Sequence, residues 1–366
     1  MKYNPYHLNI DYESRVYGLD IIRALAILDV ALIHGNMLLA KAGMDFMKIK
    51  LIDGVEMFFV LSGFLIGSML INTIEKKGLS FSTVYKFLVR RWFRTLPNYF
   101  LILIVNIIIV YFGIIKEDFS QFNYKFFFFI QNFSKPFHGF FWESWSLSIE
   151  EWFYLLFPFS ILIFGLLAFK RVKISYVVLF VISLFLIVPI MLRASVVNIE
   201  SYWNNIQMKG IVIYRLDSIA FGLLAAYLNK YHFKSFTRYK NMMLVIGLIG
   251  AFILMYIDKH HHFNFFRIFD YSILSFCIFL FLPKLNSITN IKTRFAKVVT
   301  HISMISYSMY LINLAVVAEV IYFNIPIQSK FTAIMAYLLF WFVLITLSTL
   351  LFKYYEKPMM DLRDIL

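Results

Sequence analysis

The sequence is poor in charged residues and nearly free of cysteine. Asp, Glu, Lys and Arg make up 15% of the 366 residues, and 61% are hydrophobic, whereas soluble domains are about 25% charged. The single cysteine, Cys277, excludes a disulfide within the chain and argues against a cysteine-based metal site. Residues 1–17 lack an apolar core, so we expect no cleavable signal peptide. This is the composition of a membrane protein.

Long apolar stretches are what the chain has in abundance. They predict an all-α polytopic membrane protein, a single domain over residues 1–366 with about ten transmembrane helices. The predicted spans are about 19–39, 54–74, 96–114, 148–168, 174–192, 211–229, 241–257, 267–283, 302–322 and 331–353. A further apolar run, Phe126–Ile130, is too short to span. We expect it to lie at the interface or to re-enter the protein.

The basic residues indicate how the chain is oriented. A formal net charge of +14 could suggest a nucleic-acid partner, but the Lys and Arg side chains lie in short loops between apolar spans, so we expect no nucleic acid. One alternate set of loops holds twice as many of them as the other. The positive-inside rule then places residues 1–17 and the tail 354–366 in the cytoplasm. We expect a bacterial inner membrane and contact with membrane lipid.

Arg23 and His34 stand in the first span, where ionisable groups are costly. Eleven residues make three helical turns plus roughly 20°, so both side chains project from one face, roughly 16 Å apart. This pattern indicates a lined pathway with Arg23 near the cytoplasm and His34 in the outer half. The alternative is that Arg23 reaches the headgroups and His34 bonds a neighbouring helix.

Two carboxylates are candidate partners of the imidazole. Glu56 begins the second span, which runs inward, so we expect it at about the depth of His34, where it could orient the ring. Ser148 and Glu151 have capping-box spacing, which would leave Glu151 a structural role. Glu150 shares a helix face with Tyr154 instead and is the better functional candidate of the two neighbouring glutamates.

Other polar groups admit two interpretations each. Arg91 and Arg94 are neighbours on one helical face and could bind phosphate, or simply anchor the helix at the inner surface. Arg215 and Asp217 are two apart, so we expect each to pair elsewhere, as a structural ion pair or as a substrate contact. For His260–His262 an interfacial loop is favoured over a metal site. The polar stripe from Ser306 to Asn313 could line a cavity or join helices.

Taken together, these stretches resemble the membrane acyltransferase-3 family, whose members move acyl groups onto sugars and other cell-envelope or secreted acceptors. The matching stretches are Gly18–Arg23 with His34, Gly54–Ile66, Arg91 and Arg94 with Pro97, Trp145–Pro158, Ser306–Leu311 and Glu356–Pro358. They cover essentially the whole chain in the family's order. Two positions depart from the family pattern: Glu56 replaces the usual Asp, and Asn313 stands where His is frequent. We expect the stand-alone form, without the esterase-like domain that follows the last span in longer members.

The resemblance implies an O-acetyltransferase that takes acetyl groups from cytoplasmic acetyl-CoA. It implies that Arg91 and Arg94, continued by Arg23, bind the coenzyme, and that His34 is the base or a transient acyl carrier. Glu150 or Glu56 would hold the ring as catalytic partners, and no metal is expected. The candidate acceptor contacts are Tyr154, Arg215, Asp217 and Asn313.

The acceptor stays open at this stage: a lipopolysaccharide O-antigen sugar, an exopolysaccharide, peptidoglycan or a small secreted glycoside would each fit. Another acyl group, such as succinyl, is an alternative on the same fold. A membrane transporter and a non-catalytic envelope scaffold are alternatives of another class. The sequence does not predict an oligomeric state.

Overall fold

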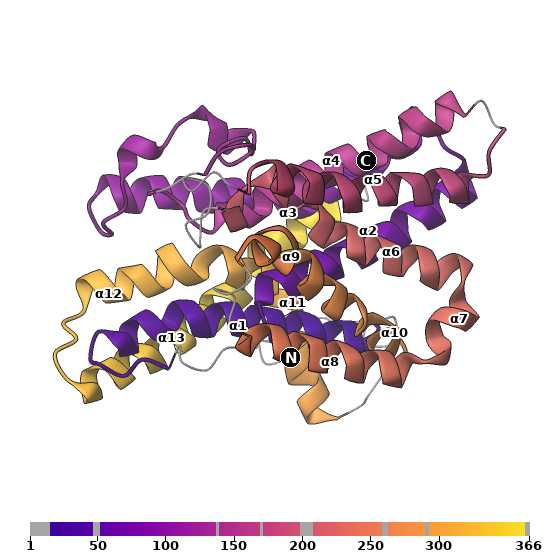
Figure 1. Cartoon of the computed structure of the whole chain (residues 1–366). Coiled ribbons are helices and arrows are strands. Elements are labelled where there is room, and N and C mark those ends of the chain that lie inside the picture. Colours follow the sequence, from indigo (N-terminus) through magenta and orange to yellow (C-terminus); the bar gives the residue numbers. More distant parts are fainter. Residues whose placement is uncertain are drawn as a thin grey trace, which may run out of the picture.

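The protein is a bundle of helices in the computed structural model, which describes residues 15–46, 52–136, 139–168, 171–197, 208–257, 263–289 and 293–362 (Figure 1). Within these residues, eight helical stretches are long and apolar enough to cross a membrane. They are Tyr17–Ala40 (α1), Gly54–Lys77 (α2), Phe81–Tyr111 (α3), Ser144–Leu167 (α4), Ile174–Ser195 (α5), Asn264–Asn286, Arg294–Asn324 and Lys330–Leu362.

The last three stretches are each made of several elements. They comprise α9 (Phe263–Phe279), α10 (Leu282–Asn286), α11 (Arg294–Ile312), the π-helix η6 (Asn313–Glu319), α12 (Val320–Asn324), α13 (Lys330–Leu351), the π-helix η7 (Phe352–Glu356) and α14 (Lys357–Leu362). Three shorter helices complete the bundle: α6 (Leu216–Tyr231), α7 (Phe233–Arg238) and α8 (Lys240–Tyr256). Each of the ten predicted spans falls on a helix, and the prediction of an all-α polytopic membrane protein is confirmed.

Helices α2 and α6 approach closely because glycines face each other. A Cβ added to Gly63 would lie 2.0 Å from the backbone oxygen of Ile219, and one added to Gly222 would lie 2.0 Å from that of Val60. No side chain fits at either point, so the two backbones pack directly against each other. This contact fixes one wall of the bundle.

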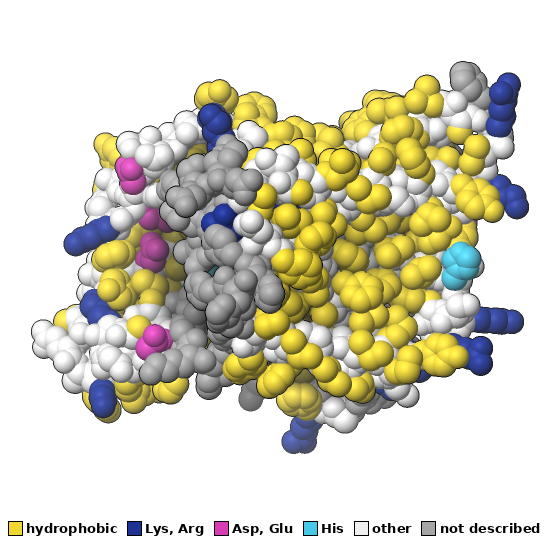
Figure 2. Space-filling model, viewed as in Figure 1, with side chains coloured by type: hydrophobic (Ala, Val, Ile, Leu, Met, Phe, Trp, Pro, Cys, Tyr) yellow, Lys and Arg dark blue, Asp and Glu magenta, His cyan; other side chains and the backbone are white. Residues whose placement is uncertain are grey.

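The surface shows where the membrane lies. On the face in Figure 2, an apolar belt separates two ends that carry Lys and Arg. Asp and Glu are visible only at the end that holds the turn between α12 and α13. The opposite end, with the turn between α6 and α7, shows Lys, Arg and a His but no Asp or Glu, and therefore matches the predicted cytoplasmic side.

The structure changes the predicted edge of one span. Helix α3 begins at Phe81 rather than near residue 96, because the side chain of Ser80 caps it by accepting a hydrogen bond from Thr83 N at 3.2 Å. The helix continues through Pro97. Arg91 and Arg94 therefore belong to the helix that crosses the membrane, and their positions are fixed by it.

The short apolar run at 126–130 folds back into the bundle. It contains the 3₁₀ turn Tyr124–Phe127 (η2), and the buried Phe126 accepts a hydrogen bond at its carbonyl from Tyr99 OH at 2.8 Å. Trp152 Nε1 donates to the Phe129 carbonyl at 2.9 Å. Tyr99 lies about 18 Å along α3 from the helix end at Tyr111. The run thus packs against α3 and α4 through Phe126 and Phe129, whereas Phe127 and Phe128 are exposed.

Candidate functional site

A pocket lies between α2, α3, α4 and α11, with one residue from α1. It contains about 780 Å³ of space unoccupied by protein, including the part open at its mouth. Its polar lining residues are Arg23, Ser62, Arg91, Arg94, Thr95, Ser146, Glu150, Tyr154, Ser306, Tyr307 and Tyr310. Five of the predicted site residues, Arg23, Arg91, Arg94, Glu150 and Tyr154, are therefore brought together.

The pocket extends along the membrane normal and changes character from end to end. Its lining residues on α2 run from Val55 to Ile66, which corresponds to about 16 Å of helix. The three arginines lie at the inner end. The outer end is lined by Val55, Phe58, Phe59 and Tyr310. A cationic mouth therefore leads outward to an apolar, aromatic end.

The residues that line the pocket carry more positive than negative charge. Arg23 donates to Ser303 Oγ at 3.3 Å and lies 3.7 Å from Asp20 Oδ1. Asp20 also pairs with Arg15. Within the described residues, Arg94 makes no hydrogen bond or ion pair. Three guanidinium groups and a single carboxylate face the pocket, an arrangement suited to a phosphate-bearing ligand.

Glu150 is held inside the pocket rather than beside the imidazole. Its carboxylate accepts hydrogen bonds from Ser62 Oγ at 2.8 Å and from Tyr154 OH at 2.6 Å, which confirms that Glu150 and Tyr154 share a face. The prediction that Glu150 orients His34 is wrong, because both carboxylate oxygens bond these hydroxyls. The capping role for Glu151 is also wrong, because α4 begins at Ser144, seven residues earlier.

His34 is oriented by an amide. Its Nδ1 bonds Asn313 Oδ1, and Asn313 Nδ2 donates to the carbonyls of Met309 at 3.1 Å and Tyr310 at 2.7 Å. Because the amide nitrogen faces two carbonyls, its oxygen faces the ring, and the neutral imidazole carries its proton on Nδ1. Nε2, which has no partner within the described residues, is left with a lone pair. In this structure Asn313 therefore contacts the imidazole ring.

The arginine-lined pocket stops short of His34. His34 does not line it, and Ile27 and Val30, which lie between Arg23 and His34 on the same helix, are 0% and 5% exposed. Their packing closes the route predicted along α1. The outward route follows α2, α4 and α11 instead and ends at Phe58 and Tyr310, one helical turn before Asn313.

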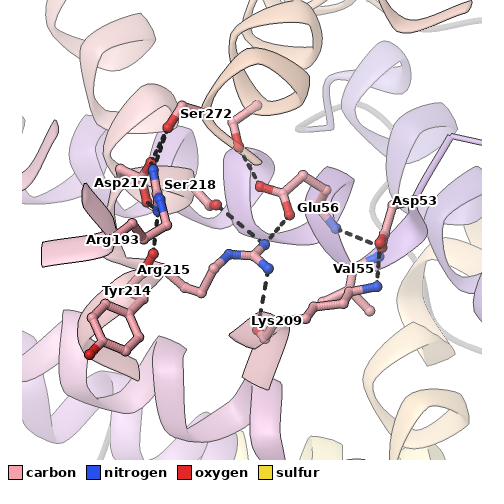
Figure 3. A network of polar contacts seen from close by, with 11 residues as sticks. Asp53, Val55, Glu56, Arg193, Lys209, Tyr214, Arg215, Asp217, Ser218 and Ser272 are labelled. Atoms are coloured by element: carbon pink, nitrogen blue, oxygen red, sulfur yellow. Dashed lines mark hydrogen bonds and ion pairs between the residues drawn. The ribbon is translucent and has the colours of Figure 1, made fainter. Parts of the chain in front are cut away.

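Glu56 lies deeper than predicted. Gly54 N donates to Asp29 Oδ2 at 2.8 Å, so α2 starts level with the middle of α1, and Glu56 sits about 10 Å inward of His34 along the axis. Figure 3 shows its carboxylate turned to Arg215, with which it forms an ion pair, and it also accepts from Ser275 Oγ. The proposed Glu56–imidazole contact is therefore wrong.

Asp217 belongs to a second buried ion pair beside the first (Figure 3). Arg193 donates to its two carboxylate oxygens at 3.0 and 2.7 Å, and Ser272 Oγ donates at 2.5 Å. Arg193, Arg215 and Asp217 are each 0% exposed. The prediction that Arg215 and Asp217 pair elsewhere is confirmed, and in this structure they are shielded from any acceptor. The sequence analysis missed Arg193, whose partner comes from another helix.

The polar stripe of α11 serves both predicted purposes. Ser306, Tyr307 and Tyr310 line the pocket, whereas Ser308 Oγ donates to Glu356 Oε2 at 2.5 Å and joins α11 to η7. Tyr310 was not singled out from the sequence, because its position at the end of the pocket depends on the neighbouring helices. His260–His262 lie outside the described residues.

Fold and pocket define a polytopic membrane protein whose helices enclose a cation-lined, elongated binding pocket. The chain belongs to the acyltransferase-3 family: the family model described as an acyltransferase domain matches residues 16–353. The resemblance seen in the sequence motifs is thereby confirmed. No solved structure matches the chain.

Curated relatives resemble parts of the chain. A peptidoglycan O-acetyltransferase, OatA of Listeria monocytogenes, is 32% identical over 41% of this chain and 25% of its own length. A putative O-acetyltransferase of Staphylococcus aureus is 32% identical over 44% of this chain and 27% of its own length. The putative peptidoglycan O-acetyltransferase YrhL of Bacillus subtilis is 30% identical over 47% of this chain and 28% of its own length. The matched region spans about a quarter of each relative.

Proposed function

We propose that the protein is a membrane O-acetyltransferase that moves an acetyl group from cytoplasmic acetyl-CoA to a hydroxyl of an extracytoplasmic or lipid-linked sugar. The names of the relatives support O-acetylation of a peptidoglycan-type glycan. The observation that carries the proposal is the pocket itself, with cations at one end and aromatic side chains at the other. In the orientation predicted by the positive-inside rule, the cations face the cytoplasm. This polarity fits a donor made inside and an acceptor held outside, in a bacterial inner membrane.

The residues that line the pocket are chemically suited to bind coenzyme A. Arg23, Arg91 and Arg94 supply fixed cations for the phosphates. Beyond them, Leu61, Leu65 and the other apolar residues of α2 present a surface suited to an uncharged arm. Glu150 and Tyr154 stand where the arm would pass and offer it polar contacts.

His34 provides the base. Its Nε2 takes the proton of the acceptor hydroxyl as the oxygen attacks the thioester carbonyl carbon. The carbon–sulfur bond breaks, the sulfur leaves as thiolate, and the imidazolium returns the proton to it. The products are an acetyl ester and a free thiol. Asn313 keeps the proton on Nδ1 and so holds Nε2 in the basic form.

This step requires Phe58 and Tyr310 to move apart, because they line the end of the pocket nearest Asn313, the residue that bonds the imidazole. Phe58 is half-buried and contacts Tyr310 edge to face, at 6.2 Å between ring centres. A rotation of one aromatic side chain is a small motion within a packed bundle. It would join the donor pocket to the His34 side only after a donor has bound with its acyl group seated against the unrotated rings.

The test is acetyl transfer by purified protein in vesicles, using labelled acetyl-CoA and peptidoglycan fragments. Wild type should label the glycan. His34→Ala should lower the rate by about 10²–10⁴-fold. His232→Ala removes an exposed imidazole at the end of α6 and should keep the wild-type rate. Equal rates for wild type and His34→Ala would contradict the role of His34, and no transfer by wild type to any glycan would contradict the function.

A further inference from the structure

The outer end of the pocket is lined by aromatic side chains. Phe58 and Tyr310 meet edge to face. The hydroxyl of Tyr310 shares a hydrogen bond of 2.5 Å with Ser146 Oγ and lies 3.2 Å from the Glu143 carbonyl. These two bonds fix the Tyr310 ring from the side of α4. The Phe58 side chain, in contrast, has no polar group that could form such a hydrogen bond.

This end is where the acyl group would lie, given the proposed function. If the phosphates bind at the arginines, the thioester lies at the far end of the pocket, between Val55, Phe58 and Tyr310. The space beyond the thioester carbonyl is therefore bounded by the Phe58 ring. An acyl chain longer than acetyl would have to occupy the volume of that ring.

The same lining discriminates by charge. Val55, Phe59 and Leu147 surround the end of the pocket, and the pocket's cations lie at the opposite end. Arg215, 5.7 Å from the centre of the Phe59 ring, is already paired with Glu56, and the nearby Lys209 is paired with Asp53. A carboxylate carried on the acyl group would therefore be buried there without a cation of its own, which costs several kcal/mol. Tyr310 OH is already engaged with Ser146 and offers little compensation.

We infer that Phe58, backed by Tyr310, limits the donor to a short, uncharged acyl group such as acetyl, and that the pocket rejects long acyl groups and carboxylate-bearing groups such as succinyl. The inference rests on the proposed function. It assigns the choice of acyl group to a single side chain on the pocket wall. It also decides between the acetyl and succinyl alternatives that the sequence left open.

The experiment compares kcat/KM for acetyl-, butyryl- and succinyl-CoA in the vesicle assay. Wild type should favour acetyl over butyryl by about 10–200-fold, the range that a misfitting methylene or two produces in an apolar pocket. Phe58→Leu should reduce this ratio about tenfold by raising butyryl transfer. Succinyl transfer should stay low in both, because the charge still lacks a partner. Because the ratio compares two donors on the same protein sample, a lower yield of folded enzyme does not change it.

Phe64→Leu is the matched control. Phe64 is a buried phenylalanine six residues further along α2 and does not line the pocket, so its variant should keep the wild-type ratio. The inference would be overturned if wild type used butyryl-CoA or succinyl-CoA at the same rate as acetyl-CoA. It would also be overturned if Phe58→Leu left the ratio unchanged. Neither result would contradict acetyl transfer itself. Absence of transfer from every donor would instead overturn the proposed function.

Discussion

Two regions of this molecule bury charge inside an apolar bundle, and they do so in opposite ways. In the cluster of Figure 3, each guanidinium meets a carboxylate: Arg215 pairs with Glu56, and Arg193 with Asp217. In the pocket, three arginines face one another across open space with a single carboxylate. The cluster is closed and neutral. The pocket is open and positive.

The difference shows what a charge in a membrane helix can be used for. A paired, fully buried charge is satisfied by its own fold and joins helices, here α2, α5, α6 and α9. A charge that faces a pocket is also available to a ligand. The charge itself does not identify a functional residue. Its access to a pocket does.

The largest effect should follow from breaking the closed cluster. Arg215→Ala leaves Glu56 buried at 0% exposure without its cation, which costs about 3–5 kcal/mol. We expect the variant to be scarce in membranes and to unfold at much lower temperature, as measured by abundance and by thermal unfolding in detergent. Adding Glu56→Gln should recover part of the loss.

Lys230→Ala is the matched control for that experiment. Lys230 also lies on α6 and pairs with Glu75 at 2.7 Å, but the side chains are 37% and 30% exposed, so its loss should cost less than about 1 kcal/mol. The structural role of Arg215 would be contradicted if the Arg215→Ala protein were abundant and stable but inactive. Arg215 would then act on substrate.

A smaller effect concerns a third kind of buried ionisable group, a carboxyl group without a cationic partner. Glu143, at the start of α4, is 1% exposed; one carboxylate oxygen accepts from Ala315 N at 2.9 Å, and the other has no partner within the described residues. Burial, with the nearby charge of Glu117, raises the pKa of Glu143 to about 8. Burial also raises the pKa of Glu117 to about 7.

The sign of the pH effect follows from these raised pKa values. The folded state holds a proton on Glu143 that the unfolded state releases near pH 4.5, so stability falls as the pH rises from about 4.5 to about 8. We expect the melting temperature of wild type to fall across this pH range, and the melting temperature of Glu143→Gln to fall less. Asp118→Asn is the control, because hydrogen bonds from Ser120 and Gln121 lower the pKa of Asp118 and keep it ionised throughout. Equal slopes in wild type and Glu143→Gln would contradict this.

Helix positions and the grouping of the arginines could be predicted from the sequence, because both depend on local spacing. Apolar length defines a span, and Arg91 and Arg94 share a face by helical geometry alone. The link between Glu150 and Tyr154 was predictable for the same reason. These predictions need no knowledge of which helices are neighbours.

The partners of His34 and Glu56 could not be predicted in this way. The sequence places Glu56 near the start of a span, but the chain returns inside the bundle before α2 begins, and only the Gly54–Asp29 contact reveals the depth. Asn313 reaches the imidazole because α11 packs against α1. Arg193 lies at the end of a span and looks like an anchor until the fold brings Asp217 to it.

The central claim, that the open pocket binds the donor, is tested most directly by the binding of coenzyme A. Calorimetry on purified protein should compare wild type, Arg94→Gln and Arg90→Gln, since Arg90 lies on the same helix but is exposed and does not line the pocket. Loss of a charge-assisted contact of about 1.5–3 kcal/mol predicts a Kd roughly 10–100-fold higher for Arg94→Gln, with Arg90→Gln near wild type. Equal Kd values for all three proteins, or no binding by wild type, would contradict the account.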